Sequence, residues 1–417
     1  MPGNCVYFNS LKDEISFSSL RNPAGCLACG KCNNFPILDT FIKDDSRYAK
    51  DIQKREGFGI AVDIGTTTIV MALLDLKAGI IIARHSFFNP QLIYGSDVIS
   101  RIQAANDGHL EKMRILITES LAKGFDELLN AGKIRQIEEI VISGNTVMIH
   151  LLLGLSCEFL GVSPFNIKHT LKKQYVFKEI FKLNFESPLL ENINSSCQVR
   201  IIPWFSAYAG GDLTSGLLSV LPEGKEKFLL LDLGTNGEIA LFNDKKVTVT
   251  SCAAGPAFEG QGGASQVIGK LAELIKEKKI DETGLFVKEE SFSPAEFFSQ
   301  KQIRHLQLAK SAIRSAVEIL IEETGVNYES LEEVFLAGGI GQAVNPDDAV
   351  ITGIIPKELA CKLSAIGNAS LAGAVRYLIS PLRANEDVSL LFSGFKEINL
   401  GGHPKFNDLF VKNMFFN

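Results

Sequence analysis

The sequence predicts an α/β protein built from one unit that occurs twice. The first observation is a repeat: "GIAVDIGTTTIVMALLDL" (59–76) and "FLLLDLGTNGEIALFN" (228–243) both contain an apolar run, an aspartate, a Gly-Thr turn and a second apolar run. The second observation is that such strand patterns are followed by segments of helical periodicity in each half. A repeat of this size predicts two domains of one fold.

Composition narrows the class of protein. The chain has 417 residues, 46% of them hydrophobic, which is enough for two or three domains with sizeable cores. The net charge is −6 and no basic stripe stands out, which argues against nucleic acid as the main partner. No leader peptide is evident, and charges such as Asp63, Asp75 and Lys77 interrupt the longest apolar tracts. We expect a soluble, cytoplasmic protein that does not bind a membrane.

The first half divides into three parts. Residues 1–40 form a short Cys-rich segment, and the charged residues 41–56 form a linker. Residues 57–226 form the first domain. There we expect three consecutive strands from residue 59 to 87, a helix over 109–132, a strand over 137–145 and a helix over 146–155. An irregular stretch then leads to a helix that starts near Asp212, a plausible N-cap.

The second half repeats this order. Residues 227–382 form the second domain, in which three strands over 227–252 surround another acidic turn. A strong helical pattern covers 303–324, and residues 331–344 predict a strand, a glycine turn and a helix. Residues 383–417 form a C-terminal extension that packs on the core, with a strand expected over 388–395.

The repeated turn has the chemistry of a phosphate site. Gly65 and Gly234 permit a tight turn between adjacent strands. Carboxylates just before each turn, at Asp63 and Asp232, can hold Mg²⁺ through its waters. Two such turns facing each other would grip a polyphosphate and one metal ion, although two ordinary hairpins with polar tips remain the alternative. The phosphate donors would come from Thr66, Thr67, Thr68, Thr235 and Asn236.

A third motif is the glycine turn "LAGGIG" at 336–341. Gly338, Gly339 and Gly341 would let the backbone pass close to a flat ligand. A dinucleotide fingerprint is a weak alternative, because Val344 stands where the third small residue belongs. No P-loop string is present.

In this order the three motifs resemble the phosphate-1, phosphate-2 and adenosine motifs of the superfamily of acetate and sugar kinases, heat-shock chaperones and actin (ASKHA). The resemblance covers residues 58–374. It implies two ribonuclease-H-like domains around a nucleotide cleft that binds ATP and Mg²⁺. It also implies that the chain has ATPase-type chemistry.

The resemblance suggests further site residues. The helix over 302–323 would lie beside the adenosine, where Lys310 and Arg314 would contact the ribose or adenine unless they are merely surface charges. Asp212 would orient or deprotonate the water that attacks the γ-phosphate, unless it only caps its helix. Gly255 would lie in a glycine-rich cover over the nucleotide.

The cysteines near the N-terminus predict a metal centre. Cys26, Cys29 and Cys32 have the Cys-x2-Cys-x2-Cys spacing of an iron–sulfur site, with Cys5 as the available fourth ligand. The plant-type spacing is absent, so a 4Fe-4S cluster is favoured over 2Fe-2S, with four-thiolate zinc as the alternative. Disulfides are not expected in a reducing compartment. The remaining cysteines are expected to be small buried apolar residues: Cys157, Cys197, Cys252 and Cys361.

Four further segments resemble the reductive activators of corrinoid proteins: "NPQLIYGSDVISRI" (89–102), "ISGNTVMIHLLLGL" (142–155), "AAGPAFEG" (253–260) and "GNASLAGA" (367–374). Members of that family use ATP and an iron–sulfur centre to return Co(II) corrinoid to Co(I) in the methyltransferase systems of anaerobes. The resemblance implies two partners, a corrinoid protein and a low-potential electron donor. The N-terminal segment is shorter than the family's full ferredoxin domain, which leaves the cluster type open. A homodimer is one of the open oligomeric states.

Two enzymatic alternatives share the nucleotide motifs. A small-molecule kinase would not need the N-terminal cysteines. An ATP-dependent activator of a dehydratase or reductase carries its cluster cysteines within the ATPase domain, whereas here they precede it. A chaperone-like or filament-forming ATPase would have no redox centre. The position of the cysteines therefore favours the corrinoid activator.

Overall fold

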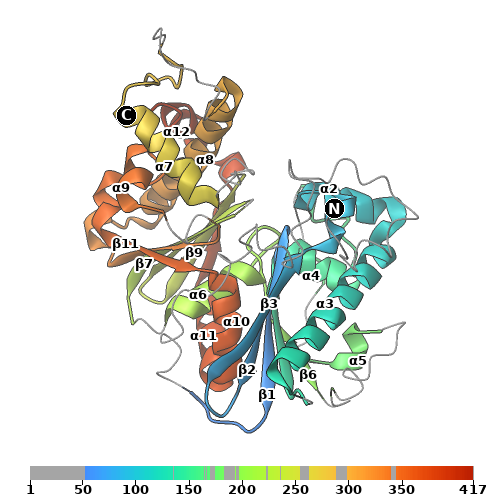
Figure 1. The fold of residues 1–417 in the computed structure, drawn as a ribbon. Helices are drawn as coiled ribbons and strands as arrows, with labels where there is room; N and C mark the ends of the chain where they lie inside the picture. Colours follow the sequence, from blue (N-terminus) through green and yellow to red (C-terminus); the bar gives the residue numbers. More distant parts are fainter. Residues whose placement is uncertain are drawn as a thin grey trace.

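The computed structural model has two lobes that meet along a central pair of helices (Figure 1). It describes residues 52–134, 136–163, 165, 167–169, 174–182, 193, 197–221, 224–234, 236–253, 263–287, 298–339 and 344–416. Several predicted site residues lie outside these ranges: Cys5, Cys26, Cys29, Cys32, Thr235, Gly255 and Gly341.

The first lobe is built on a six-stranded sheet. Its strand order is β3 (Ile80–Phe88), β2 (Thr68–Asp75), β1 (Phe58–Ile64), β4 (Glu139–Gly144), β6 (Gln198–Ile201) and β5 (Tyr175–Val176). β1, β2 and β3 are consecutive antiparallel strands, and β4 and β6 run parallel to β1.

The second lobe repeats this topology. Its order is β11 (Leu363–Gly367), β10 (Glu333–Ala337), β7 (Lys227–Leu233), β8 (Gly237–Asn243), β9 (Lys246–Cys252) and β12 (Phe395–Glu397). β7, β8 and β9 are antiparallel, and β10 and β11 run parallel to β7. Five strands of each sheet share one order and the same directions, whereas β5 and β12 are added at opposite ends; this correspondence confirms the predicted duplication and the two-lobed ASKHA fold class.

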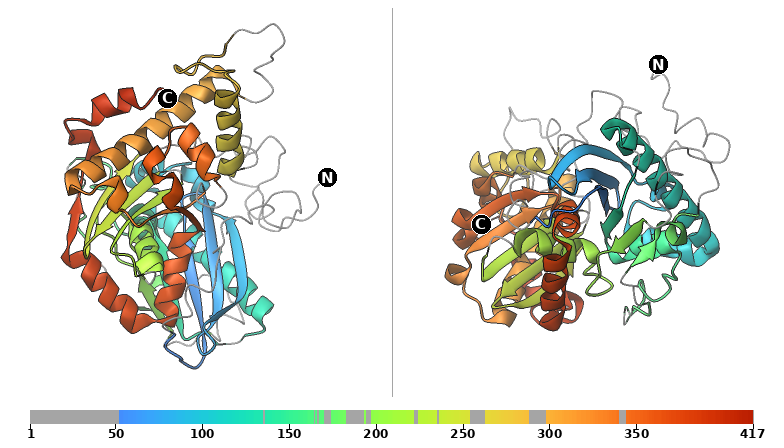
Figure 2. Two further views of the ribbon diagram at one scale, coloured as in Figure 1. Left: turned by 90° about the vertical axis from the view of Figure 1, so that its left-hand side faces the viewer. Right: turned by 90° about the horizontal axis from the view of Figure 1, so that it is seen from below.

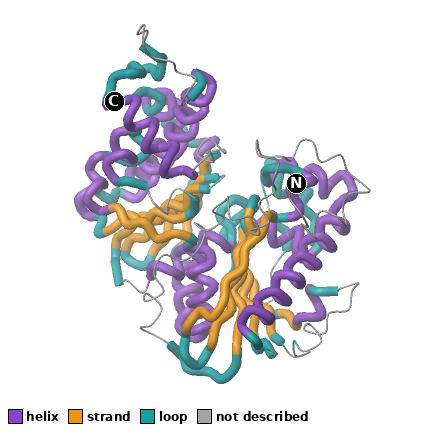
Figure 3. The backbone as a smooth tube through the Cα atoms, viewed as in Figure 1, coloured by secondary structure: helices purple, strands orange, loops and turns teal. Residues whose placement is uncertain are grey.

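Helices cover both faces of each sheet (Figure 3). Among the described helices, none is both long and apolar enough to cross a membrane. The helices are α2 (Val98–Ala104), α3 (Leu110–Gly132), α4 (Thr146–Leu153), α5 (Phe177–Ile180), α6 (Gly211–Val220), α7 (Gly263–Lys276), α8 (Gln300–Thr324), α9 (Pro346–Ile351), α10 (Ala369–Ile379), α11 (Pro381–Ser393) and α12 (Phe406–Lys412). Short 3-10 turns are η4 (Pro90–Tyr94), η10 (Tyr328–Ser330), η11 (Lys357–Lys362) and η12 (Leu400–Gly402), and η5 (Ala105–His109) is a π turn.

Successive side chains along each strand point to opposite faces of the sheet, and this divides the interior into three apolar cores. In β1, Ile60 and Val62 face a core with α3 and α4, whereas Ala61 faces the other side. In β7, Leu229 faces a core with α7 and α8, whereas Leu230 faces the other side. The third core therefore lies between the two sheets and is filled by α6, α10 and α11, which lie between the lobes in Figure 2.

The helix pair α6–α10 is packed through small residues. A Cβ atom added to Gly373 of α10 would lie 1.8 Å from the carbonyl oxygen of Ser215 in α6. α10 also packs against β1 and β4 of the first sheet, although it directly follows β11 of the second. The first sheet is therefore covered on one face by a helix from the far end of the chain.

The C-terminal extension differs from the sequence prediction. Residues 388–393, expected in a strand, continue helix α11, and only Phe395–Glu397 form a short strand beside β9. The buried residues of α11 are Ala384, Asp387 and Leu391, which have the spacing of one helix face. The apolar run around Leu391 conceals this spacing in the sequence. Helix α12 then packs against α8.

Candidate nucleotide-binding site

The first acidic turn joins β1 to β2. The amide of Gly65 donates to the carbonyl of Thr68 at 3.1 Å and closes the turn. A Cβ atom at Gly65 would lie 2.5 Å from that same carbonyl oxygen, so the turn requires glycine. Thr66 and Thr67 therefore lie at the tip of a tight hairpin, in which Thr66 is only 8% exposed.

Side chains from the next segments hold this turn. The amide of Asn89 donates from Nδ2 to the Gly65 carbonyl at 2.9 Å, and Arg101 donates from Nη2 to the Thr66 carbonyl at 2.6 Å. Asn145 caps α4 and donates from Nδ2 to the Thr66 hydroxyl at 3.1 Å. The turn is thus fixed on both its backbone and its side-chain faces.

The second acidic turn joins β7 to β8, where the amide of Gly234 donates to the Asn236 carbonyl at 3.0 Å. Gly338, the first residue after β10, has φ +75° and lies against this turn. A Cβ atom at Gly338 would be 2.4 Å from Oδ1 of Asp232. Gly339 follows it. The glycine turn and the second acidic turn are therefore neighbours.

Asp63, at the end of the first turn's leading strand, is held by the second half of the chain. Its carboxylate accepts hydrogen bonds from the Ser370 hydroxyl at 2.7 Å and from Nδ2 of Asn368 at 2.8 Å. Burial raises the pKa of Asp63, and the two hydrogen bonds oppose that rise. Asp63 is thus a fixed group at the junction of the two lobes.

Four carboxylates crowd the space between the lobes. Burial, and then the nearby Asp63, raise the pKa of Asp212 to about 7. Burial, followed by Asp212 and Asp63, raises the pKa of Asp232 to about 8. The pKa of Glu238 is raised well above its usual range by burial and by Asp212 and Asp232. The two turns and helix α6 therefore bring their acids into one electrostatic cluster.

This cluster fits a hydrated magnesium ion. Among the described residues, no group of three or more Asp, Glu, His or Cys side chains is close enough to hold a metal directly. No basic side chain is among the causes of the raised pKa values of Asp212, Asp232 and Glu238. Carboxylates that repel one another around a gap suit Mg²⁺ that keeps most of its waters.

Asp212 lies in the first turn of α6 but does not cap the helix. The N-cap is Gly210, and Oδ1 of Asp212 accepts from the amide of Leu213 at 2.9 Å. A Cβ atom at Gly210 would lie 2.5 Å from that Oδ1 and 2.6 Å from the Cα of Asn145. The capping alternative is therefore wrong. A carboxylate with a pKa near neutrality suits a general base.

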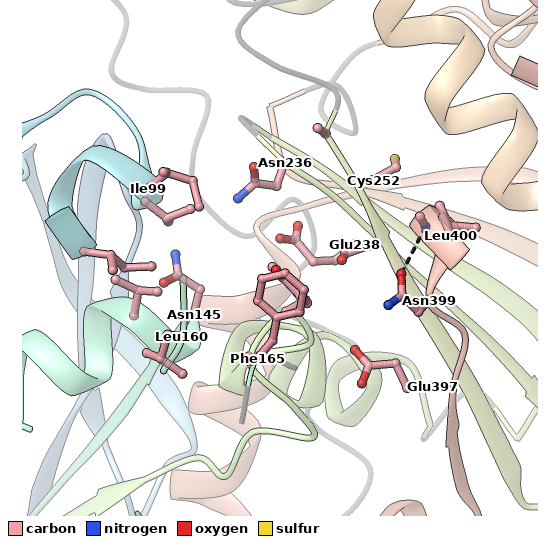
Figure 4. A pocket seen from close by; sticks show the side chains of 18 of the residues that line it. Ile99, Asn145, Leu160, Phe165, Asn236, Glu238, Cys252, Glu397, Asn399 and Leu400 are labelled. Carbon is pink, nitrogen blue, oxygen red and sulfur yellow. Dashed lines mark hydrogen bonds between the residues drawn. The ribbon is translucent and has the colours of Figure 1, made fainter. Parts of the chain in front are cut away.

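A cavity of about 460 Å³ has Glu238 of the acidic cluster in its lining (Figure 4). Ile99, Leu160 and Phe165 of the first lobe form an apolar wall, whereas the second lobe contributes Glu397 and Asn399. Asn236 and Glu238 of the second hairpin also line it, as does Asn145, which contacts Thr66 of the first acidic turn.

Lys310 and Arg314 have protein partners on the second lobe. Lys310 is buried, with its ammonium on the Phe415 carbonyl and 4.8 Å from the centre of the Phe416 ring. Burial lowers its pKa to about 8. Arg314 pairs with Glu318 at 2.6 Å. Neither residue lines the cavity, and a nucleotide contact by either stays a prediction.

Three of the scattered cysteines are buried as expected, and one is not. Burial raises the pKa of Cys157 and Cys197 to about 12, and Cys252 is also buried. Cys361 is exposed, because it lies in the 3-10 turn η11 on the surface. Its apolar sequence neighbours did not reveal this.

Sequence reasoning missed several residues of the site. Glu238 is directly opposite Asp232 in the hairpin register, a position that could have been counted from the short turn. Asn368 and Ser370 lie in "GNASLAGA", which was noted for its resemblance but given no role. Asn145 lies in "ISGNTVMIHLLLGL", and its contact with Thr66 spans 79 residues.

The duplicated fold and its facing acidic turns define a two-lobed protein of the ASKHA class. The sequence model of the RACo middle region matches residues 58–221, and that of the C-terminal domain of RACo, the ASKHA domain, matches 226–273 and 264–417. The chain therefore belongs to the RACo family.

Named relatives agree with this assignment. The chain is 31% identical to the corrinoid activation enzyme RamQ of Eubacterium limosum, over 86% of this chain and 70% of the relative. It is 22% identical to a [Co(II) methylated amine-specific corrinoid protein] reductase of Methanosarcina barkeri, over 80% and 72%. A solved structure of a reductive activator for corrinoid, iron–sulfur protein superposes with a TM-score of 0.74 at 28% identity, covering 86% of this chain and 66% of that one.

Proposed function

We propose that this chain is an ATP-dependent reductive activator of a corrinoid protein in a methyltransferase system. One observation supports the proposal: in this RACo-family chain, Asp63 and Asp232 of the two acidic turns and Asp212 of α6 act on one another electrostatically. The names of RamQ and of the corrinoid protein reductase indicate the substrate class. The protein would act in the cytoplasm with a low-potential electron donor.

ATP would bind between the lobes. The turn from Gly65 to Thr68 and the turn from Gly234 to Asn236 would hold its phosphates, and Gly338, Gly339 and Gly341 would lie against its adenosine. Asp63 and Asp232 would hold Mg²⁺ through its waters, and the ion would neutralise phosphate charge. Asp212 would accept the proton of the water that attacks the γ-phosphorus, while the bond from that phosphorus to ADP breaks.

Electron transfer would begin at the N-terminal segment. Cys26, Cys29 and Cys32, with Cys5 as the fourth ligand, would hold an iron–sulfur cluster, 4Fe-4S by their spacing. Such a cluster supplies one-electron transfer, and one electron converts Co(II) corrinoid to Co(I). Nucleotide binding would favour one arrangement of the lobes over another, and that difference in affinity would drive the step.

The first experiment is iron and acid-labile sulfide content with an EPR spectrum, on anaerobically purified protein and on C26A. We expect a four-iron signal in the wild type and its loss in C26A. The same preparations, mixed with a Co(II) corrinoid protein and a chemical reductant, should form Co(I) only when wild type, Mg²⁺ and ATP are all present. Zinc, or no metal, would overturn the electron-transfer mechanism and favour a small-molecule kinase.

A further inference from the structure

The cleft poses an electrostatic problem. Asp63, Asp212, Asp232 and Glu238 gather where a polyphosphate must bind. A single Mg²⁺ offsets part of that negative charge, but ATP adds several charges of its own. A site that takes a polyanion among acids needs another source of positive charge close to the phosphates.

Arg101 of α2 is a buried cation directly behind the first phosphate turn. It is 0% exposed, and its Nη2 donates to the Thr66 carbonyl at 2.6 Å. Its other hydrogen bonds go to neutral groups, the Gly95 carbonyl at 3.0 Å and the Met148 sulfur at 3.2 Å. Among the described residues, no carboxylate forms an ion pair with it.

Burial without an ion pair is costly for a guanidinium, so the fold maintains Arg101 against an energetic penalty. Asp97, on the same helix, is the acid that acts on it through space, and that carboxylate already accepts the Ser100 amide. The turn contacted by Arg101 also meets Asn145, which lines the cavity, and Ile102 beside Arg101 lines it as well. The charge is thus buried next to the cleft with its counter-charge missing.

We propose that Arg101 is a positioning residue for polyphosphate, whose buried charge is balanced by the phosphates of the bound nucleotide. It fixes the carbonyl of Thr66, so that the turn presents its amides and hydroxyls to the phosphates. This inference rests on the proposed function, because it takes the ligand of the cleft to be a nucleoside triphosphate.

The test compares R101M, R101K and the control R114M in the full-length protein. Arg114 pairs with Glu111 on α3 and contacts neither turn. Binding of Mg²⁺–ATP and of adenosine is measured by calorimetric titration. We expect R101M to bind ATP about tenfold more weakly, roughly 1.4 kcal/mol, with adenosine binding unchanged. R101K should fall between R101M and wild type, since lysine keeps the charge but loses the planar fork.

The outcomes distinguish a failure of the role proposed for Arg101 from a failure of the proposed function. Equal ATP affinity in R101M and wild type, or parallel losses for ATP and adenosine, would overturn the role of Arg101. If R101M does not fold, R101K decides, and a wild-type ATP affinity in R101K overturns the role. If the wild type binds no ATP at all, the proposed function itself fails. R114M should match the wild type for both ligands.

Discussion

Asp63 at the end of β1 accepts a 2.7 Å hydrogen bond from the hydroxyl of Ser370, which lies 307 residues further along the chain in α10. The Ser370 hydroxyl is also 2.8 Å from the Ser143 hydroxyl in β4. The backbone carbonyl of Ser370 accepts a hydrogen bond from the Ser215 hydroxyl in α6. One serine therefore joins the strand that leads into the first acidic turn to helices α6 and α10.

Removing that hydroxyl should weaken both stability and turnover. S370A deletes a buried donor to a carboxylate, so we expect the free energy of unfolding to fall by about 1–2 kcal/mol. The pKa of Asp63 should rise further, because the bond favours its charged form. Urea unfolding measures the loss of stability, and steady-state ATP hydrolysis measures the loss of turnover. S389A, which loses an exposed serine bond in α11, is the control, and an equal loss there would contradict the prediction.

Replacing Asp212 should separate binding from chemistry. D212N keeps the shape of the side chain but cannot take a proton from water, so we expect ATP hydrolysis to fall about a hundredfold or more. The affinity for Mg²⁺–ATP should change little or increase, because one repelling charge is gone. Single-turnover hydrolysis and calorimetric titration check these outcomes. Wild-type turnover in D212N would rule out Asp212 as the base.

The unliganded protein should lose stability from about pH 5 to pH 8 because of the acidic cluster. Burial raises the pKa of Asp212 to about 7 and that of Asp232 to about 8, from an ordinary value of 3.8. Between these values the folded state holds protons that the unfolded chain has released, so raising the pH favours unfolding.

The difference between wild type and D212N measures the part of this effect that depends on Asp212, including its contribution to the raised pKa values of Asp232 and Glu238. His150, whose pKa burial lowers to about 4, acts in the opposite direction but contributes equally to both proteins. The free energy of unfolding is measured with urea at a series of pH values across this range. As the pH rises, that of D212N should increase relative to wild type by about a few kcal/mol, the order expected for pKa shifts of this size. Parallel pH profiles for the two proteins would show that Asp212 does not titrate as proposed.

A methyl group at the crossing of α6 and α10 should destabilise the whole molecule. G373A places a Cβ atom 1.8 Å from the Ser215 carbonyl, so the helices must separate. We expect a loss of about 3 kcal/mol or more in the free energy of unfolding, together with reduced ATP turnover. Differential scanning calorimetry against G402A, where a Cβ atom meets nothing within 4 Å, provides the comparison. Similar melting of both variants would contradict the close packing.

The strands and the positions of the two acidic turns between them could be predicted from the sequence, because each depends on a local pattern. β1, β2, β7 and β8 are apolar runs bounded by Asp-x-Gly turns, and two copies of such a pattern fix a topology. The prediction of a strand over residues 388–393 was wrong, because a short apolar run such as the one around buried Leu391 is compatible with either a strand or a helix.

The supporting contacts of the site could not be predicted, because they join distant segments. Arg101 reaches Thr66 across 35 residues, and Asn368 reaches Asp63 across 305. No periodicity or spacing records which side chains the fold brings together. The N-cap of α6 also could not be predicted, because it depends on a distant contact: Gly210 rather than Asp212 caps the helix, and its close approach to Asn145 requires glycine.

The central helix layer constrains how the protein can be made. The inner face of the first sheet, with Ala61, Val70 and Val141, is covered by residues of α10 such as Leu371 and Val375. On a ribosome, that sheet would be complete long before its covering helix leaves the exit tunnel. The nascent first half must therefore expose an apolar surface until nearly the whole chain has been translated. Truncation after β11 would leave the first lobe open as well as the second.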